Sequence, residues 1–95
     1  MTETVAKIFT SSKNINVDGK IFKLLQEAHA VKCVIINTDK LAIYIQVQLK
    51  NGNLAKIQTT RGKLKYWSSF DTAINWLKNM GVTKAYIDLT YGTKI

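Results

Sequence analysis

The chain has 95 residues, 46% of them hydrophobic, and a formal net charge of +8 at pH 7. This length suits one compact domain, so we expect residues 1–95 to form a single domain whose loose ends are residues 1–15 and 90–95. The hydrophobic content excludes a disordered chain, and no apolar run approaches the roughly 20 residues of a membrane-spanning helix. Residues 1–4 lack a basic segment followed by an apolar one, so we expect no signal peptide, a soluble cytoplasmic protein and no membrane partner.

The basic residues are concentrated in the second part of the chain. Residues 1–30 carry four lysines and three acids, whereas residues 31–95 carry ten basic residues and three acids. No acid lies between Asp39 and Asp71. A field of one sign attracts polyanions such as nucleic acid, although the same lysines also keep a small protein in solution. The charge therefore leaves both interpretations open.

The first element predicted with clear signals is a helix over about residues 18–30. Asp18 can cap its first turn, and apolar residues follow at helical spacing from Ile21. His29 falls in the expected last turn, where the helix dipole favours a cation. Residues 1–15 are ambiguous, because their apolar positions also fit one face of a short helix.

An antiparallel β-meander is predicted over about residues 32–67. It begins with a β-branched apolar run at Cys33, which we expect to be a buried strand residue. Residues 41–49 alternate strictly between apolar and other side chains, as a half-buried strand does. Strands over residues 54–60 and 63–67 complete the meander.

Two turns set the register of this meander, and hence its faces. A three-residue loop at Asn51-Gly52-Asn53 places Val47 opposite Ile57. A tight turn at Arg61-Gly62 then places Ile57 opposite Tyr66. Both pairings gather apolar side chains on one face of the sheet.

The last predicted elements are a helix over about residues 69–80 and a final strand over about residues 82–89. Ser68 or Ser69 can cap this helix, and Gly81 can end it. Its apolar stripe should pack on the apolar face of the meander. The predicted fold class is therefore α+β.

The opposite face of the meander is predicted to be basic, rich in amides and aromatic rings, and free of acids and aliphatic side chains. Lysines pair with phosphates, glutamines can hydrogen-bond base edges, and aromatic rings stack on bases. The predicted nucleic-acid-binding residues on this face and its turns are Tyr44, Gln46, Gln48, Lys50, Lys56, Gln58, Thr60, Arg61, Lys63, Lys65 and Trp67. A solvated sheet face without a ligand has a similar composition, so that alternative stays open.

One stretch carries a resemblance. Residues 62–77 form a basic strand followed by the pattern Ser-Phe-x-Thr-Ala-x-x-Trp-Leu. Over about residues 41–80 the chain resembles the three-stranded-sheet-plus-helix DNA-binding modules of integrase arm-binding and AP2-like domains, and also small plasmid or mobile-element proteins. In the integrase-type modules the sheet enters the major groove. The resemblance implies this role for Lys56, Gln58, Thr60, Lys63 and Lys65.

Three functions follow from these features. The first is binding of double-stranded DNA, in preference to RNA, in a regulatory or accessory role for a mobile element. The second is binding of single-stranded DNA or RNA on the same face. The third is a protein-interaction or dimerisation module, such as a homodimer, without a nucleic-acid role. We expect no enzyme, cofactor or metal site, because the acids are scattered and the chain has one histidine and one cysteine.

Overall fold

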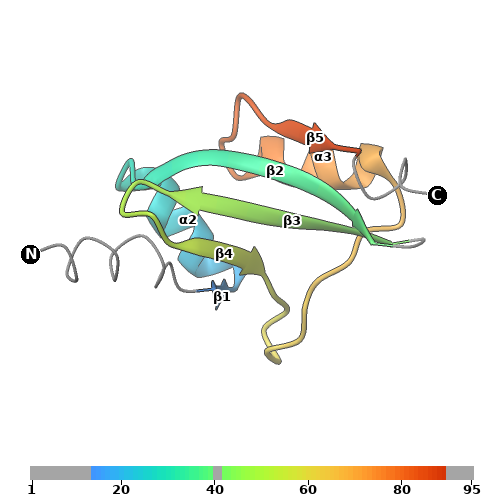
Figure 1. Ribbon diagram of the computed structural model, residues 1–95, viewed down its shortest axis with the longest axis horizontal. Coiled ribbons are helices and arrows are strands. Elements are labelled where there is room, and N and C mark those ends of the chain that lie inside the picture. Colours follow the sequence, from blue (N-terminus) through green and yellow to red (C-terminus); the bar gives the residue numbers. More distant parts are fainter. Residues whose placement is uncertain (1–13, 40–41, 90–95) are drawn as a thin grey trace, which may run out of the picture.

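Over residues 14–39 and 42–89, which the structure describes, a five-stranded mixed sheet carries two helices on one face (Figure 1). The structure is a computed structural model. The α+β class is confirmed, whereas the expectations for residues 1–13 and 90–95 lie outside the described residues. In chain order the elements are β1 (Asn14–Val17), α2 (Gly19–Glu27), β2 (Val31–Asp39), β3 (Ala42–Leu49), β4 (Leu54–Ile57), α3 (Phe70–Asn79) and β5 (Tyr86–Asp88).

The strands lie in the order β1-β4-β3-β2-β5. The central strands β2, β3 and β4 are antiparallel, as predicted, but β1 pairs with β4 and β5 pairs with β2 in parallel. The prediction of a purely antiparallel meander is therefore wrong at both edges. The final strand is also shorter than predicted. Each helix links two strands that run in the same direction, as parallel strands require.

The core lies between the sheet and the two helices. The burial of β3 alternates along its whole length, which confirms the predicted half-buried strand. Phe22 of α2 and Leu77 of α3 belong to one buried hydrophobic cluster with the strand residues Ile45, Val47 and Ile57. Both helices therefore cover the same face of the sheet.

The helix ends follow the predicted capping chemistry. The Asp18 carboxylate accepts a hydrogen bond from the Ile21 N–H at 2.9 Å, and Ser69 caps α3. Gly81, at φ 88°, ends α3, where the Val82 N–H donates to the Leu77 carbonyl. The prediction that His29 lies in the last helical turn is wrong. His29 follows α2 in the left-handed conformation at φ 56°.

The first hairpin has the predicted faces but a different register. Val47 pairs with Ala55 instead of Ile57, a shift of two residues. The loop is Lys50-Asn51-Gly52, closed by the Leu49 N–H, which donates to the Asn53 carbonyl at 2.9 Å. Because side chains alternate with a period of two, this shift leaves the side chains of β3 and β4 on their predicted faces.

The second turn differs by one residue, which reverses the faces after it. The Thr59 N–H donates to the Lys63 carbonyl at 2.7 Å, so the loop has three residues instead of the predicted two. Residues 63–67 form isolated bridges, not a full strand. Trp67 is consequently 8% exposed on the helix side, and Tyr66 is 48% exposed on the other side. This register buries the larger ring and leaves the tyrosine hydroxyl near water.

Candidate nucleic-acid interface

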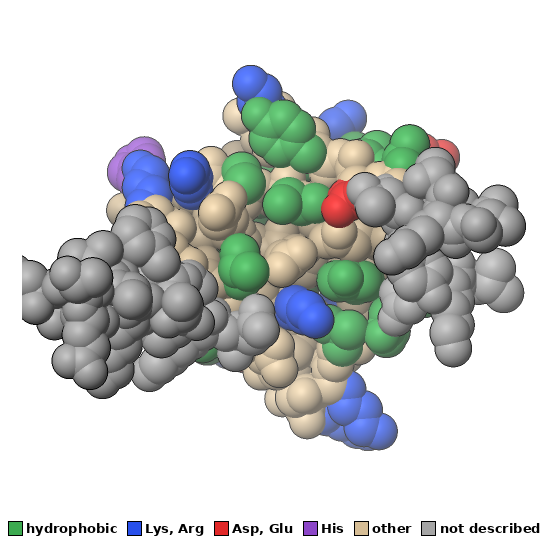
Figure 2. Space-filling model, viewed as in Figure 1, with side chains coloured by type: hydrophobic (Ala, Val, Ile, Leu, Met, Phe, Trp, Pro, Cys, Tyr) green, Lys and Arg blue, Asp and Glu red, His purple; other side chains and the backbone are tan. Residues whose placement is uncertain are grey.

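The face of the sheet opposite α2 and α3 is here termed the open face. Figure 2 shows hydrophobic and basic side chains interspersed over its described part. By strand register and side-chain alternation it consists of Asn16, Cys33, Ile35, Asn37, Tyr44, Gln46, Gln48, Leu54, Lys56, Tyr66, Tyr86 and Asp88.

An aromatic and basic cluster lies near one end of the open face. The rings of Tyr44 and Tyr66 meet edge to face, with centroids 6.3 Å apart and planes at 81°. The Lys56 Nζ lies 5.5 Å from the centroid of the Tyr44 ring. Such a cation–π contact holds the ammonium group beside the aromatic surface. The cluster therefore offers stacking surface and positive charge within one side-chain length of each other.

Polar side chains beside this cluster are held by one another. The Asn37 Nδ2 donates to the Gln46 Oε1 at 3.3 Å, and the Cys33 thiol donates to the Gln48 Oε1 at 3.2 Å. Asn37 is buried, whereas Cys33 is half-buried, which corrects the prediction of a buried cysteine. These contacts fix amide orientations before any ligand arrives, which lowers the ordering cost of binding.

The structure separates the predicted site residues into three groups. Tyr44, Gln46, Gln48 and Lys56 lie on the open face. Exposed turn residues are Lys50, in the first hairpin loop, and Thr60, Arg61 and Lys63, in the second. The remaining residues, Gln58, Lys65 and Trp67, lie at or toward the helix side.

Three predicted open-face residues are therefore misplaced: Gln58 lines a pocket with Lys65 and Trp76, and Trp67 is buried on the helix side. Trp67 is buried against Trp76 of α3, with ring centroids 5.2 Å apart. Lys65 lies over these same rings, its Nζ 5.4 Å from each centroid. A ligand on the open face cannot stack on Trp67, because the sheet lies between them.

Several open-face residues were missed by the sequence reasoning. Leu54 of β4 is aliphatic, so the prediction of a meander face without aliphatic residues is wrong. Ile35 of β2 and Asp88 of β5 add an aliphatic and an acidic side chain beyond the predicted face. Tyr86 and Asp88 join this face because β5 pairs with β2. The sequence places two aromatic residues side by side, Tyr66 and Trp67. Only the length of the preceding turn decides which of the two lies on the open face.

No group of three or more His, Cys, Asp or Glu residues within 14–39 and 42–89 is placed to hold a metal ion. No helix in the same ranges is long and apolar enough to cross a membrane. Among known proteins, no family model and no curated sequence matches this chain.

Proposed function

We propose that the open face binds single-stranded nucleic acid, DNA or RNA. The observation that supports this function is the cluster of Tyr44, Tyr66 and Lys56 on a face that α2 and α3 leave uncovered. Single strands expose their bases, which stack on aromatic side chains, while lysines pair with the backbone phosphates. The amides of Gln46 and Gln48 lie beside the cluster and can hydrogen-bond base edges.

The width of the sheet favours single strands over duplex DNA on this face. Strands are spaced by about 4.8 Å, so the five strands extend over about 19 Å. The major groove is about 12 Å wide and admits a two-stranded ribbon. Tyr44 and Gln46 lie on the middle strand of the five, flanked by β4 and β2, so they are poorly placed to reach into a groove.

Duplex DNA is the second candidate, and a different segment favours it. The turn around residues 59–63 projects from the sheet between β4 and α3 (Figure 1). It carries Arg61 and Lys63, both exposed. Two cations on a projecting turn fit duplex phosphates, and in this arrangement the open face would make no contact with bases. A role in a mobile element stays a prediction under either candidate.

Fluorescence anisotropy with labelled random single strands and duplexes, at about 50 and 200 mM salt, tests the proposal. We expect tighter binding of single strands, weakened by salt. Tyr44→Ala with Tyr66→Ala should reduce affinity about tenfold or more, because stacking contributes about 1–3 kcal/mol per base. The matched control, Tyr44→Phe with Tyr66→Phe, keeps both rings and should retain most of the affinity.

Two other outcomes would reject the proposal. Preference for duplex, unaffected by the tyrosine substitutions but lost on Arg61→Gln with Lys63→Gln, would establish the second candidate. Absence of binding at low salt would exclude both, leaving the lysines a role in solubility and the open face a role in protein association.

A further inference from the structure

A pocket of about 320 Å³ lies on the helix side, away from the open face. It is formed where α2 begins, where α3 ends and along residues 58–65. Its lining includes Lys20, Lys23, Thr59, Lys65, Trp76 and Met80. The volume is at the lower end of the range of about 300–1,000 Å³ typical of small-molecule sites.

The polar groups around this pocket favour an anion. Three of its lining residues are lysines and none is acidic. The neighbouring Asp18 carboxylate is engaged by the Ile21 N–H at 2.9 Å. The Thr59 Oγ1 accepts a hydrogen bond from the Lys63 N–H at 3.2 Å, which leaves its own O–H to donate. Ammonium and hydroxyl donors around one pocket whose lining has no carboxylate are suited to phosphate oxygens.

The apolar part of the lining favours an anion that carries an apolar or aromatic organic group. Trp76 stacks on Phe22, with centroids 5.7 Å apart and planes at 16°, so its indole is held in place. Met80 lies beside it in the lining, and a flexible thioether adapts to varied shapes. The Lys65 Nζ is placed 5.4 Å from the Trp76 centroid, which joins the cationic and aromatic parts of the pocket.

We propose that this pocket binds a nucleotide through its phosphate, with the nucleoside against Trp76 and Met80. The phosphate pairs with Lys20, Lys23 and Lys65. The nucleotide is either free or the phosphorylated end of a nucleic-acid strand, since both present the same group. The pocket and the open face lie on opposite sides of the sheet, so this proposal does not depend on the open face binding nucleic acid.

Intrinsic tryptophan fluorescence reports on this pocket selectively. The chain has two tryptophans, Trp67 and Trp76, and their rings are in contact. At constant ionic strength we expect AMP and ATP to change this fluorescence in a saturable way, inorganic phosphate to bind at least tenfold more weakly than ATP, and adenosine to bind more weakly than AMP. The dissociation constant is the readout, because substitutions near the indoles also change the starting signal.

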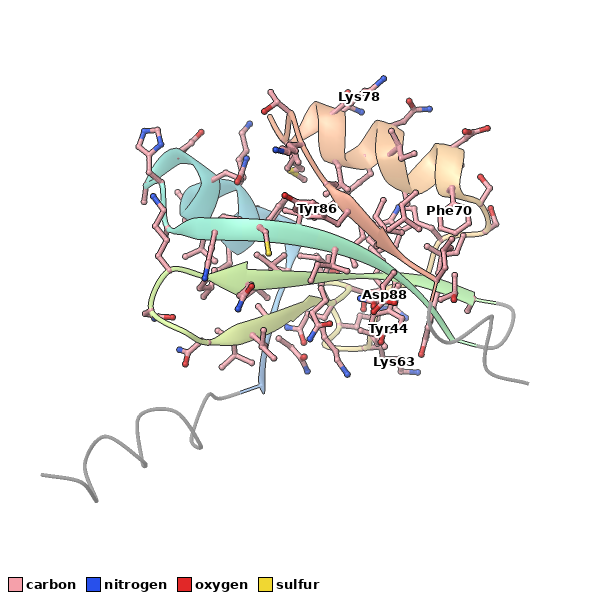
Figure 3. All side chains as sticks on the ribbon, turned by 45° about the horizontal axis from the view of Figure 1, so that its top comes forward. Tyr44, Lys63, Phe70, Lys78, Tyr86 and Asp88 are labelled. Atoms are coloured by element: carbon pink, nitrogen blue, oxygen red, sulfur yellow. The ribbon has the colours of Figure 1, made fainter. Side chains whose placement is uncertain are left out.

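Lysine substitutions locate the site. Lys20→Gln with Lys23→Gln should raise the dissociation constant for ATP at least tenfold, and Lys65→Gln severalfold or more. The control is Lys78→Gln, since Lys78 is an exposed residue of α3 outside the pocket (Figure 3) and its loss should change the constant less than twofold. Thermal unfolding of each variant establishes that it is folded.

Competition identifies the source of the phosphate. Displacement of AMP by a 5′-phosphorylated oligonucleotide, but not by its 5′-hydroxyl counterpart, would assign the site to strand ends, and failure of both would assign it to free nucleotides. Tyr44→Ala with Tyr66→Ala should leave AMP binding unchanged, which separates this site from the open face. No saturable response to AMP or ATP, or equal losses in the Lys78→Gln control and the Lys20→Gln/Lys23→Gln variant, would overturn the proposal.

Discussion

The two faces of the sheet differ in what covers them. On the helix side, Ile45, Val47 and Ile57 are completely buried beneath α2 and α3. On the open face, Tyr66 is 48% exposed and Tyr86 is 53% exposed. Since apolar burial stabilises by about 25 cal/mol per Å², the folding free energy is concentrated on the helix side. The open face contributes less to the folding free energy.

Neighbouring residues Trp67 and Tyr66 give the largest contrast between the faces. Trp67→Ala should destabilise the protein by about 3–5 kcal/mol, because it leaves a cavity beside Trp76. Tyr66→Ala should cost about 1 kcal/mol or less, because that ring is half exposed. Urea denaturation of both variants measures the difference. A larger loss of stability for Tyr66→Ala than for Trp67→Ala would support the register predicted from the sequence.

This contrast also shows where sequence reasoning succeeds for the fold. Alternation in residues 41–49 identified the buried side of β3, and the caps at Asp18 and Ser69 located both helices. Each of these signals is local. An error of two residues in the register of the first hairpin left the predicted faces of its strands unchanged. An error of one residue in the second turn assigned Tyr66 and Trp67 to each other's face.

The edge strands depend on partners that lie far away in sequence. β1 has four residues and pairs with β4 from 40 positions further along, for example Asn14 with Leu54. β5 has three residues, and all of them are exposed. Their burial therefore does not alternate between the two faces of the sheet. The position of a short parallel edge strand depends on the helix that connects it to the sheet. Local strand propensity does not encode this position.

The positions of the candidate site residues were predicted correctly only where local alternation determines the face. Tyr44, Gln46, Gln48 and Lys56 were placed on the correct face because they lie on strands whose alternation is unambiguous. Lys65 was assigned to the wrong side with Trp67, and the lysine pocket that it forms with α2 was not foreseen. Lys20 and Lys23 lie 45 and 42 residues before Lys65, so only the packing of α2 brings these residues together.

A more conservative test of the difference in burial between the two faces uses the adjacent residues Ile35 and Ile36 of β2. Ile36 is 1% exposed on the helix side, whereas Ile35 lies half-buried on the open face. Ile36→Val should cost about 0.5–1.5 kcal/mol, and Ile35→Val only a few tenths. Urea midpoints compared at equal slopes measure both changes. Equal costs would mean that a further layer, such as a second copy of the chain, covers the open face in solution.

The last comparison concerns the coupling between Tyr44 and Tyr66 on the open face. A double-mutant cycle of Tyr44→Ala, Tyr66→Ala and their combination should give a coupling of about 0.5 kcal/mol, the lower end for aromatic pairs, because both rings are partly exposed. Urea unfolding of the four proteins measures it.

A coupling near this value would mean that the edge-to-face geometry persists in solution, and hence that the open face presents a preformed stacking surface. A coupling of zero would mean that the rings move independently. Each base would then have to order its own ring on binding, at a cost of about 0.5–1.5 kcal/mol per side chain. The affinity for single strands would be correspondingly lower.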